Sequence, residues 1–261
     1  MDEIRASTWA DLHDLLFREA WKPALQRFRS DLAYRGRADA RHDLRTSLHR
    51  LGGDICALEG HLLRNFRKYA SQDAVPVDST WNWLALGQHH GLPTRLLDWT
   101  FSPWVALHFA TADLAKMDTD GIVWTVDYVR VHELVPEPLH RVLDAEGANV
   151  FTTEMLQTVA DTLRGLAAID PAPFALFVEP PSFDARIVNQ YALFSLVSRA
   201  DLALDAWLAE HPALARRILI PASLKWEIRD KLDQANITER VLFPGLDGLC
   251  RWLGRHYLPR V

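Results

Sequence analysis

The sequence predicts an α+β fold, a single mixed domain with a helical N-terminal portion and a central, mainly antiparallel sheet. Two observations favour this fold. Segments with helical periodicity and short strand-like segments alternate in both halves of the 261 residues. Apolar residues make up 49% of the chain and charged residues 24%, which provides for one large core, and no low-complexity linker divides it. We therefore expect one domain over residues 1–261, with a helical extension at 1–30 and a core at 31–253.

The N-terminal third is predicted to be mostly helical. Residues 8–28 carry apolar side chains three and four positions apart, which predicts helix in two pieces separated at Pro23, with Thr8 or its neighbour as the N-cap. Residues 31–36 predict a strand that ends near Arg35. Residues 39–51 are expected to form a loop with a helical turn. An amphipathic helix follows at 55–69, with basic residues on its polar face, namely Arg64, Arg67 and Lys68.

The central stretch, residues 81–110, alternates helix and strand signals. A helix is expected over 81–90 and ends at Gly91, with Pro93 just beyond it. Residues 95–99 form a short apolar run that predicts an extended segment. Ser102 and Pro103 then predict a helix start, with serine as the N-cap and proline at the first position.

The second half predicts further strands and helices in alternation. The expected strands are 121–127, 174–178, 193–197 and 217–220. Residues 131–165 are expected to be helical and loop-like, and further helices are expected at 183–190, 202–210 and 223–235, before residues 238–243 and 246–256 close the chain.

Bulk properties limit the classes of function. A formal net charge of −5 gives no electrostatic case for a general nucleic-acid binder. Cys56 and Cys250 lack a metal or redox spacing, and we expect both to be core residues in a reducing compartment. The N-terminus does not resemble a signal peptide, and no stretch approaches the ~18 apolar residues of a membrane span. A cytoplasmic protein without a membrane partner is expected.

The central stretch places many polar side chains among residues that must be buried. Each such group needs a partner within the protein or a ligand. They are Asn82, Gln88, His89, His90, Thr94, Arg95, Asp98, Thr100 and Ser102.

Several of these residues also have purely structural interpretations. Arg95 and Asp98, three apart in an apolar run, are expected to form a buried ion pair. Adjacent histidines on one helix point about 100° apart and no further ligands stand at metal spacing, so His89 and His90 predict no metal site. Ser102 is expected to act as a helix cap, and Thr100 shares that alternative.

The central motif resembles that of the FRG domain family. The resemblance rests on residues 88–100, Gln-His-His-Gly-Leu-Pro-Thr-Arg-Leu-Leu-Asp-Trp-Thr, followed by Ser-Pro at 102–103. The family is named for a Phe-Arg-Gly triplet, which is Tyr34-Arg35-Gly36 in this chain. The resemblance extends from about residue 32 to about residue 253 and implies a single FRG-type domain. Members of this family are bacterial and phage-associated, which implies a toxin or a phage-defence role.

A more distant resemblance is to ADP-ribosyltransferases, and it implies a similar fold and NAD as a substrate. Tyr34-Arg35-Gly36 is similar to the Arg-Gly that ends an early strand in those enzymes. Residues 98–102, with the helix at 106–110, are similar to their Ser-Thr-Ser strand end and the helix after it. The position of their catalytic glutamate is best matched by Asn189 and Gln190, with Glu179 at the end of the preceding strand as the carboxylate candidate.

This resemblance implies a role for each site residue. Arg35 would hold the phosphates, and Arg35, Gln190 and Glu179 are the catalytic candidates. Because a glutamine cannot act as a general base, the catalytic carboxylate would be Glu179 or Asp98. The remaining NAD-binding candidates share a place near those three positions, and they are Tyr34, Gly36, Gln88, His89, Trp99, Thr100 and Ser102. Among them, Thr100 or Ser102 would supply a hydroxyl and Trp99 or Tyr34 an aromatic face. We therefore expect residues around 35, 100 and 190 to line one pocket.

Two other functions fit the same residues. The first is a module that senses a nucleotide or a phage component without turnover. The second is a metal-independent nuclease that uses His89, His90 and Arg95. The sequence identifies neither the macromolecular acceptor of a transferred group nor the oligomeric state.

Overall fold

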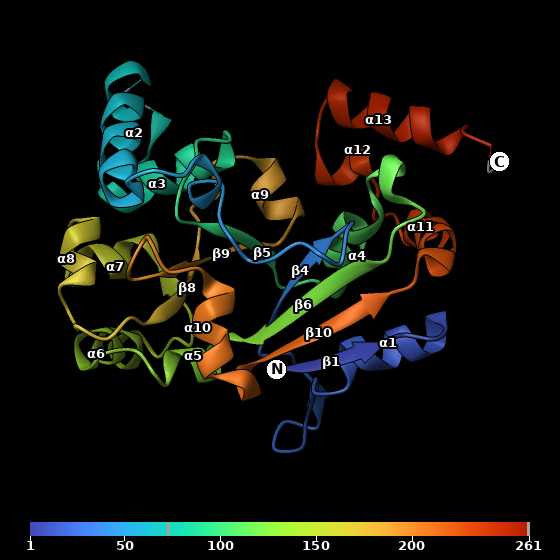
Figure 1. Cartoon of the computed structure of the whole chain (residues 1–261), viewed down its shortest axis with the longest axis horizontal. Coiled ribbons are helices and arrows are strands. Elements are labelled where there is room, and N and C mark those ends of the chain that lie inside the picture. Colours follow the sequence, from blue (N-terminus) through green and yellow to red (C-terminus); the bar gives the residue numbers. More distant parts are fainter. Residues whose placement is uncertain (72–73, 260–261) are drawn as a thin grey trace.

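A sheet of eight strands forms the centre of the computed structural model, which describes residues 1–71 and 74–259. Figure 1 shows its arrangement. The strand order is β1-β10-β6-β4-β5-β9-β8-β7. Among the described residues, the pairs β1–β10 and β7–β8 at the two edges are parallel and the other pairs are antiparallel. The strands are β1 (Asp2–Arg5), β4 (Leu32–Arg37), β5 (Leu97–Thr100), β6 (Gly121–Asp127), β7 (Phe151–Thr152), β8 (Ala175–Glu179), β9 (Ala192–Val197) and β10 (Ala215–Ile220). The predicted α+β class and mainly antiparallel sheet are confirmed.

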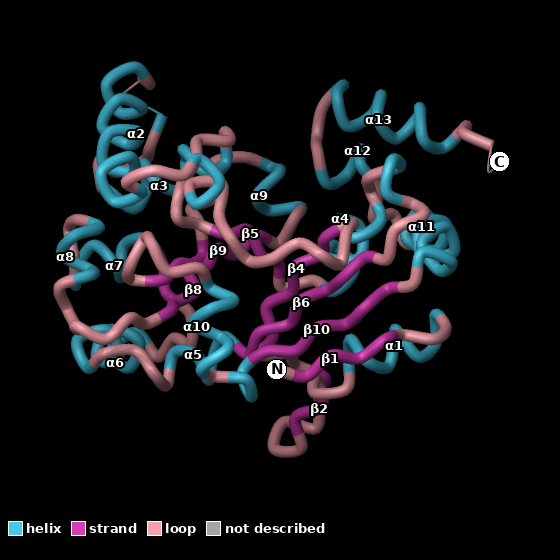
Figure 2. Tube along the Cα trace, viewed as in Figure 1, coloured by secondary structure: helices cyan, strands magenta, loops and turns pink. Residues whose placement is uncertain are grey.

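Helices cover both faces of this sheet (Figure 2). They are α1 (Trp9–Phe17), α2 (Ile55–Tyr69), α3 (Thr80–His89), α4 (Pro103–Thr111), α5 (Tyr128–His132), α6 (Glu137–Glu146), α7 (Thr153–Val159), α8 (Leu163–Ala167), α9 (Ala185–Asn189), α10 (Leu204–Glu210), α11 (Lys225–Gln234), α12 (Glu239–Leu242) and α13 (Leu246–His256). The predicted helices at 55–69, 81–90 and 202–210 are confirmed within one or two residues, and the helical turn expected in 39–51 is η1 (His49–Leu51).

Three apolar clusters divide the core. One cluster, which includes Trp99, Trp124 and Phe177, covers one face along both halves of the sheet. The opposite face carries two separate clusters. Helices α2, α3, α6 and α7 pack on β8 and β9 through one of them, and α1, α4 and α11 pack on β4, β6 and β10 through the other.

The two halves of the sheet meet at a narrow junction, which we call the seam. Strands β4 and β6 pair over six positions, from Leu32 to Arg37, whereas β4 and β5 pair only at Tyr34 and Thr100. Beyond this pair the two strands share no further ladder position in the described part of the chain, and residues of both strands line one pocket.

Gly36 lets helix α4 pack directly on β4. A Cβ atom at this position would lie 1.7 Å from the carbonyl oxygen of Ala106 and 2.8 Å from the amide nitrogen of Ala110. Because both neighbours are backbone atoms of α4, no rotamer change relieves the overlap. The missing side chain at Gly36 therefore makes room for the helix.

The N-terminal portion is less helical than predicted. Thr8 caps α1 as expected, with its hydroxyl accepting from the amide of Asp11 at 3.1 Å. The predicted second helical piece is instead a hairpin of β2 (Trp21–Lys22) and β3 (Arg27–Phe28). Residues 2–5 form β1, which joins the main sheet beside β10.

Two expectations about buried residues are also wrong. Arg95 does not pair with Asp98; its guanidinium forms a two-point contact with the carboxylate of Glu59 on α2, and its Nη1 donates to the carbonyl of Ser198 at 2.8 Å. Cys56 and Cys250 are exposed rather than in the core. In the described part of the chain, no helix is both long and apolar enough to cross a membrane.

Candidate functional site

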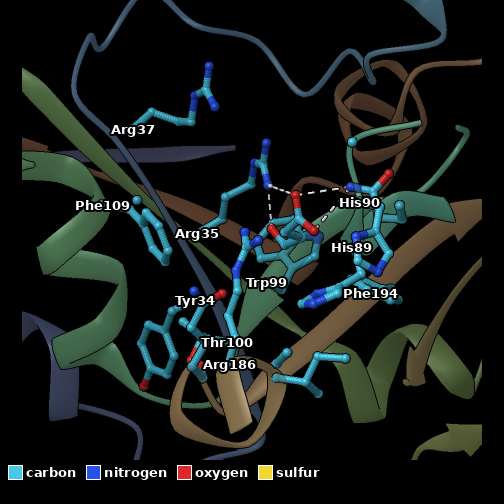
Figure 3. A pocket seen from close by; sticks show the side chains of 17 residues that line it. Tyr34, Arg35, Arg37, His89, His90, Trp99, Thr100, Phe109, Arg186 and Phe194 are labelled. Carbon is cyan, nitrogen blue, oxygen red and sulfur yellow. Dashed lines mark hydrogen bonds and ion pairs between the residues drawn. The ribbon is translucent and has the colours of Figure 1, made fainter. Parts of the chain in front are cut away.

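A pocket of about 540 Å³ opens at the seam, between β4 on one side and α3, β5 and α9 on the other (Figure 3). It brings together segments that are far apart in the sequence, around positions 35, 88, 100 and 190. Its lining residues are Tyr34, Arg35, Gly36, Arg37, Gln88, His89, His90, Gly91, Asp98, Trp99, Thr100, Phe109, Arg186, Ile187, Gln190, Ala192 and Phe194. The three positions expected to share a pocket therefore do so.

Arg35 spans the seam. Its Nη1 donates a hydrogen bond to the main-chain carbonyl of Asp98 and lies 3.9 Å from Oδ2 of the same residue. The side chain is 13% exposed, and its Nε has no hydrogen-bond partner among the described residues. Burial lowers the pKa of Arg35 to about 10, against the opposing effect of the Asp98 carboxylate. The guanidinium is thus charged at neutral pH and has an unused donor.

Asp98 supplies a carboxylate that is held in place and open to solvent. The Nε2 of Gln88 lies 3.0 Å from both carboxylate oxygens of Asp98, and the Asp98 side chain is 62% exposed. Gln88 is itself oriented, because its Oε1 accepts from the hydroxyl of Thr94 at 2.6 Å and that hydroxyl accepts from the amide of Leu96. Among the residues that line the pocket, Asp98 is the one with a carboxylate.

Helix α9 forms the opposite wall and is tied to α12. The side-chain amide of Gln190 donates to the carbonyl of Leu242 at 2.9 Å, and that of Asn189 donates to the carbonyl of Val241 at 2.7 Å. The guanidinium of Arg186 stacks 5.2 Å from the ring centre of Phe243, and its Nε has no hydrogen-bond partner among the described residues. Arg186 therefore brings a second cation with a free donor to this wall.

Arg37 adds a third cation at the edge of the pocket. Its Nη2 lies 3.0 Å from Nδ1 of His42, which therefore accepts. Burial, reinforced by the charge of nearby Arg50, lowers the pKa of Arg37. Burial and the charge of Arg37 likewise lower the pKa of His42, which keeps that ring neutral. Three arginines thus meet one carboxylate in a chain whose net charge is −5.

His89 is engaged with a carboxylate. Its Nε2 lies 2.7 Å from Oδ2 of Asp184, the residue that caps α9. Hydrogen bonds from the amide of Ile187 and from His89 lower the pKa of Asp184, although burial opposes them. Within residues 1–71 and 74–259, no group of three His, Cys, Asp or Glu side chains is arranged to hold a metal ion.

The predicted aromatic surfaces are not available to a ligand. Successive strand residues face opposite sides, so Trp99 faces away from Asp98 and Thr100. The Trp99 indole is buried against Phe177, and its Nε1 donates to the hydroxyl of Ser195 at 2.8 Å. Tyr34 is fully buried, and its hydroxyl donates to the carbonyl of Leu16 at 3.0 Å. Both residues are counted in the pocket lining, but their rings belong to the apolar core.

The two hydroxyl groups and the glutamate that were predicted to act on a ligand, those of Thr100, Ser102 and Glu179, either lie outside the pocket or bond within the protein. Ser102 caps α4, with its hydroxyl accepting from the amide of Val105, and lies outside the pocket lining. The Thr100 hydroxyl lines the pocket but donates to the carbonyl of Gln190 at 2.7 Å. Glu179 ends β8 on the face of Phe177, near Tyr128, and not in the pocket. Burial raises the pKa of Glu179 at that distant position.

Two cations were missing from the predicted site. Arg37 stands two residues after Arg35 on the same strand, and the two-residue period of a strand predicts a shared face. Arg186 precedes Gln190 by one helical turn, which places both on one side of α9. In both cases the spacing indicates the shared face, although only Arg35 and Gln190 were predicted to be site residues.

The fold and the pocket define an α+β domain with a cationic cavity at the junction of its sheet halves. Residues 30–119 match the family model of the FRG domain, which supports the predicted resemblance to that family. The matched segment contains Arg35, Gln88 and Asp98 but not α9. No solved structure matches the chain significantly, and the resemblance to ADP-ribosyltransferases stays a prediction.

Proposed function

We propose that the pocket binds a phosphate-bearing nucleotide, with NAD as the leading candidate. The observation that carries the proposal is the meeting of Arg35, Arg37 and Arg186 in one cavity of about 540 Å³. Cavities of roughly 300–1,000 Å³ are typical of small-molecule sites, and the planar guanidinium pairs with phosphate oxygens at two points. Arg35 and Arg186 each have an Nε without a hydrogen-bond partner among the described residues, so their guanidinium groups are not fully used within the protein.

We further propose that Asp98 is the carboxylate that acts on NAD. Cleavage of the bond between the ribose C1′ and the nicotinamide nitrogen leaves the electron pair on nicotinamide and develops positive charge on the ribose. A carboxylate beside C1′ stabilises that charge. A hydroxyl of water or of an acceptor then bonds to C1′ and releases its proton. Asp98 takes the role that the resemblance gave to Glu179 or Gln190, because Glu179 lies elsewhere and the amide of Gln190 is bonded to Leu242.

Binding without turnover is the second candidate function. It is favoured by the polar groups already engaged within the protein, the Thr100 hydroxyl with the Gln190 carbonyl and the Gln88 amide with Asp98. A nuclease site of His89, His90 and Arg95 is not supported, because Arg95 is buried against Glu59 and lies outside this pocket. A toxin or phage-defence role would follow from NAD cleavage.

The test measures NAD binding by calorimetry and nicotinamide release by chromatography on the same protein. Arg186→Ala is expected to weaken NAD binding about tenfold to a hundredfold, since a charged hydrogen bond contributes about 1.5–3 kcal/mol. Asp98→Asn should keep binding and lose release. Arg141→Ala, at an exposed ion pair on α6, is the matched control and should change neither.

Each outcome separates the candidates. Release that depends on Asp98 supports the enzyme, and tight binding with no release supports the sensing module. Wild-type protein that binds neither NAD nor ADP at millimolar concentration, or an Arg186→Ala variant that binds as the wild type does, would overturn the assignment of this pocket.

A further inference from the structure

A second cavity, of about 550 Å³, lies between α2, α8 and the turn after β9. It shares no lining residue with the pocket at the seam. We call it the α2–α8 groove. Part of its lining consists of small residues, and we call this part the floor: Ala57, Gly60, Ala167 and Ala200.

Gly60 has no packing reason to be glycine. It lies in the interior of the 15-residue helix α2, where glycine costs roughly 0.5–1 kcal/mol relative to alanine. A Cβ atom at this position would meet no heavy atom within 4 Å in the described part of the chain. This contrasts with Gly36, whose Cβ would overlap α4. The absent side chain at Gly60 leaves the groove open instead.

The groove carries positive charge that the protein does not neutralise. Its carboxylates are already paired, Glu59 with Arg95, and Asp201 with Arg199 at 2.6 Å. Arg64 and Arg164 have no carboxylate within ion-pairing distance among the described residues, and the Nη2 of Arg64 lies 3.2 Å from Nδ1 of His61. Two uncompensated arginines therefore face one groove in a chain whose net charge is −5.

We propose that the α2–α8 groove binds a small phosphate-bearing molecule. Arg64 and Arg164 hold its phosphate groups, because guanidinium groups form strong charge-assisted bonds to phosphate oxygens. The floor around Gly60 accepts the rest of the molecule, since no side chain projects from that position. This site is separate from the seam pocket and does not depend on the function proposed for it.

The two exposed cysteines provide a direct assay. Cys56 lines the groove, whereas Cys250 lies on α13, outside it. The rates at which a maleimide modifies each thiol are measured by peptide mass spectrometry, in the presence of ATP, pyrophosphate or inorganic phosphate. The background is Arg186→Ala, so that ligand binding at the seam pocket is weakened. At ten times the dissociation constant, a bound ligand should slow modification of Cys56 about tenfold and leave Cys250 unchanged.

Two variants and a matched control connect the protection to the groove. Gly60→Leu fills the floor and Arg64→Ala removes a phosphate contact, so each should abolish the protection of Cys56. Gly254→Leu is the control, because Gly254 is also a helical glycine with no neighbouring atom within 4 Å but lies on α13. Each rate is compared with that of the same variant without ligand.

The pattern of probes identifies the ligand class. Protection by all three probes indicates that phosphate alone is recognised, and protection by ATP alone indicates that the nucleoside is needed. Unchanged modification of Cys56 with all three probes, or equal protection in Gly60→Leu and the control, would overturn the proposal. The result leaves NAD binding at the seam pocket untouched, so the two proposals fail independently.

Discussion

Substitution of Gly36 by alanine tests the close packing of α4 on β4. The new methyl group would lie 1.7 Å from the carbonyl oxygen of Ala106. An ordinary carbon–oxygen contact is about 3.3 Å or longer, so the helix must move by roughly 1.5 Å. Overpacking typically costs about 1–3 kcal/mol, and we expect the upper end here because both contacting groups are backbone.

The expected loss of about 3 kcal/mol corresponds to a fall in Tm of roughly 6–12 °C for a chain of this size. Scanning calorimetry of the wild type and Gly36→Ala measures it. The matched control is Gly254→Ala, where a Cβ meets no described atom within 4 Å, and a gain of about 0.5–1 kcal/mol is expected from helix propensity. A Gly36→Ala protein that melts within about 1 °C of the wild type would refute the reasoning.

Three further predictions concern buried polar groups. Glu59→Gln leaves the buried Arg95 guanidinium without its counter-charge, and urea denaturation should show a loss of about 3–5 kcal/mol, against little change for the exposed Glu137→Gln. Trp99→Phe should lower the free energy of unfolding by about 1–3 kcal/mol, because it leaves the Ser195 hydroxyl without its partner. The affinity for NAD, measured by calorimetry, should stay constant because the indole faces away from the pocket. A tenfold change in affinity would contradict this orientation. His132 donates from Nδ1 to the carbonyl of Asn149 and accepts at Nε2 from the amide of Phe177, so only the neutral ring fits, and burial lowers its pKa to about 4. This folded pKa lies below the unfolded value of about 6.5, so the contribution of His132 to the free energy of unfolding is complete above pH 6.5 and is lost as the pH falls toward 4. The loss is about 2 kcal/mol at pH 5. The variant His132→Gln should lose this pH dependence of stability, and the exposed His13→Gln should keep it.

Local signals in the sequence predicted much of the fold. Ser102 and Pro103 start α4 because their capping and backbone preferences act within one turn of helix. The charged segment at 2–5 gave no strand signal, and it is extended because β10 supplies hydrogen-bond partners more than 200 residues away. Non-local pairing of this kind leaves no trace in a short window.

The candidate site was also predicted only where the signal is local in the sequence. The motif correctly predicted that Arg35 and Gln88 lie in the pocket. For Arg95, it predicted an ion pair with Asp98, three residues further along the chain. The observed partner, Glu59, is 36 residues away in the sequence, and it contacts Arg95 because α2 packs beside this segment. The strand period alone excludes a shared ligand face for Trp99 and Thr100, because adjacent residues of β5 point to opposite sides.

At the seam, the side chain of Arg35 connects the two halves of the sheet. Only one backbone pair joins β4 to β5, and the guanidinium of Arg35 adds a second link to the carbonyl of Asp98. An anion that competes for this guanidinium would therefore loosen the junction at the same moment as it occupies the cavity. Hydrogen exchange at the Asp98–Thr100 amides should consequently respond to ligand, while the six-position ladder between β4 and β6 keeps its protection.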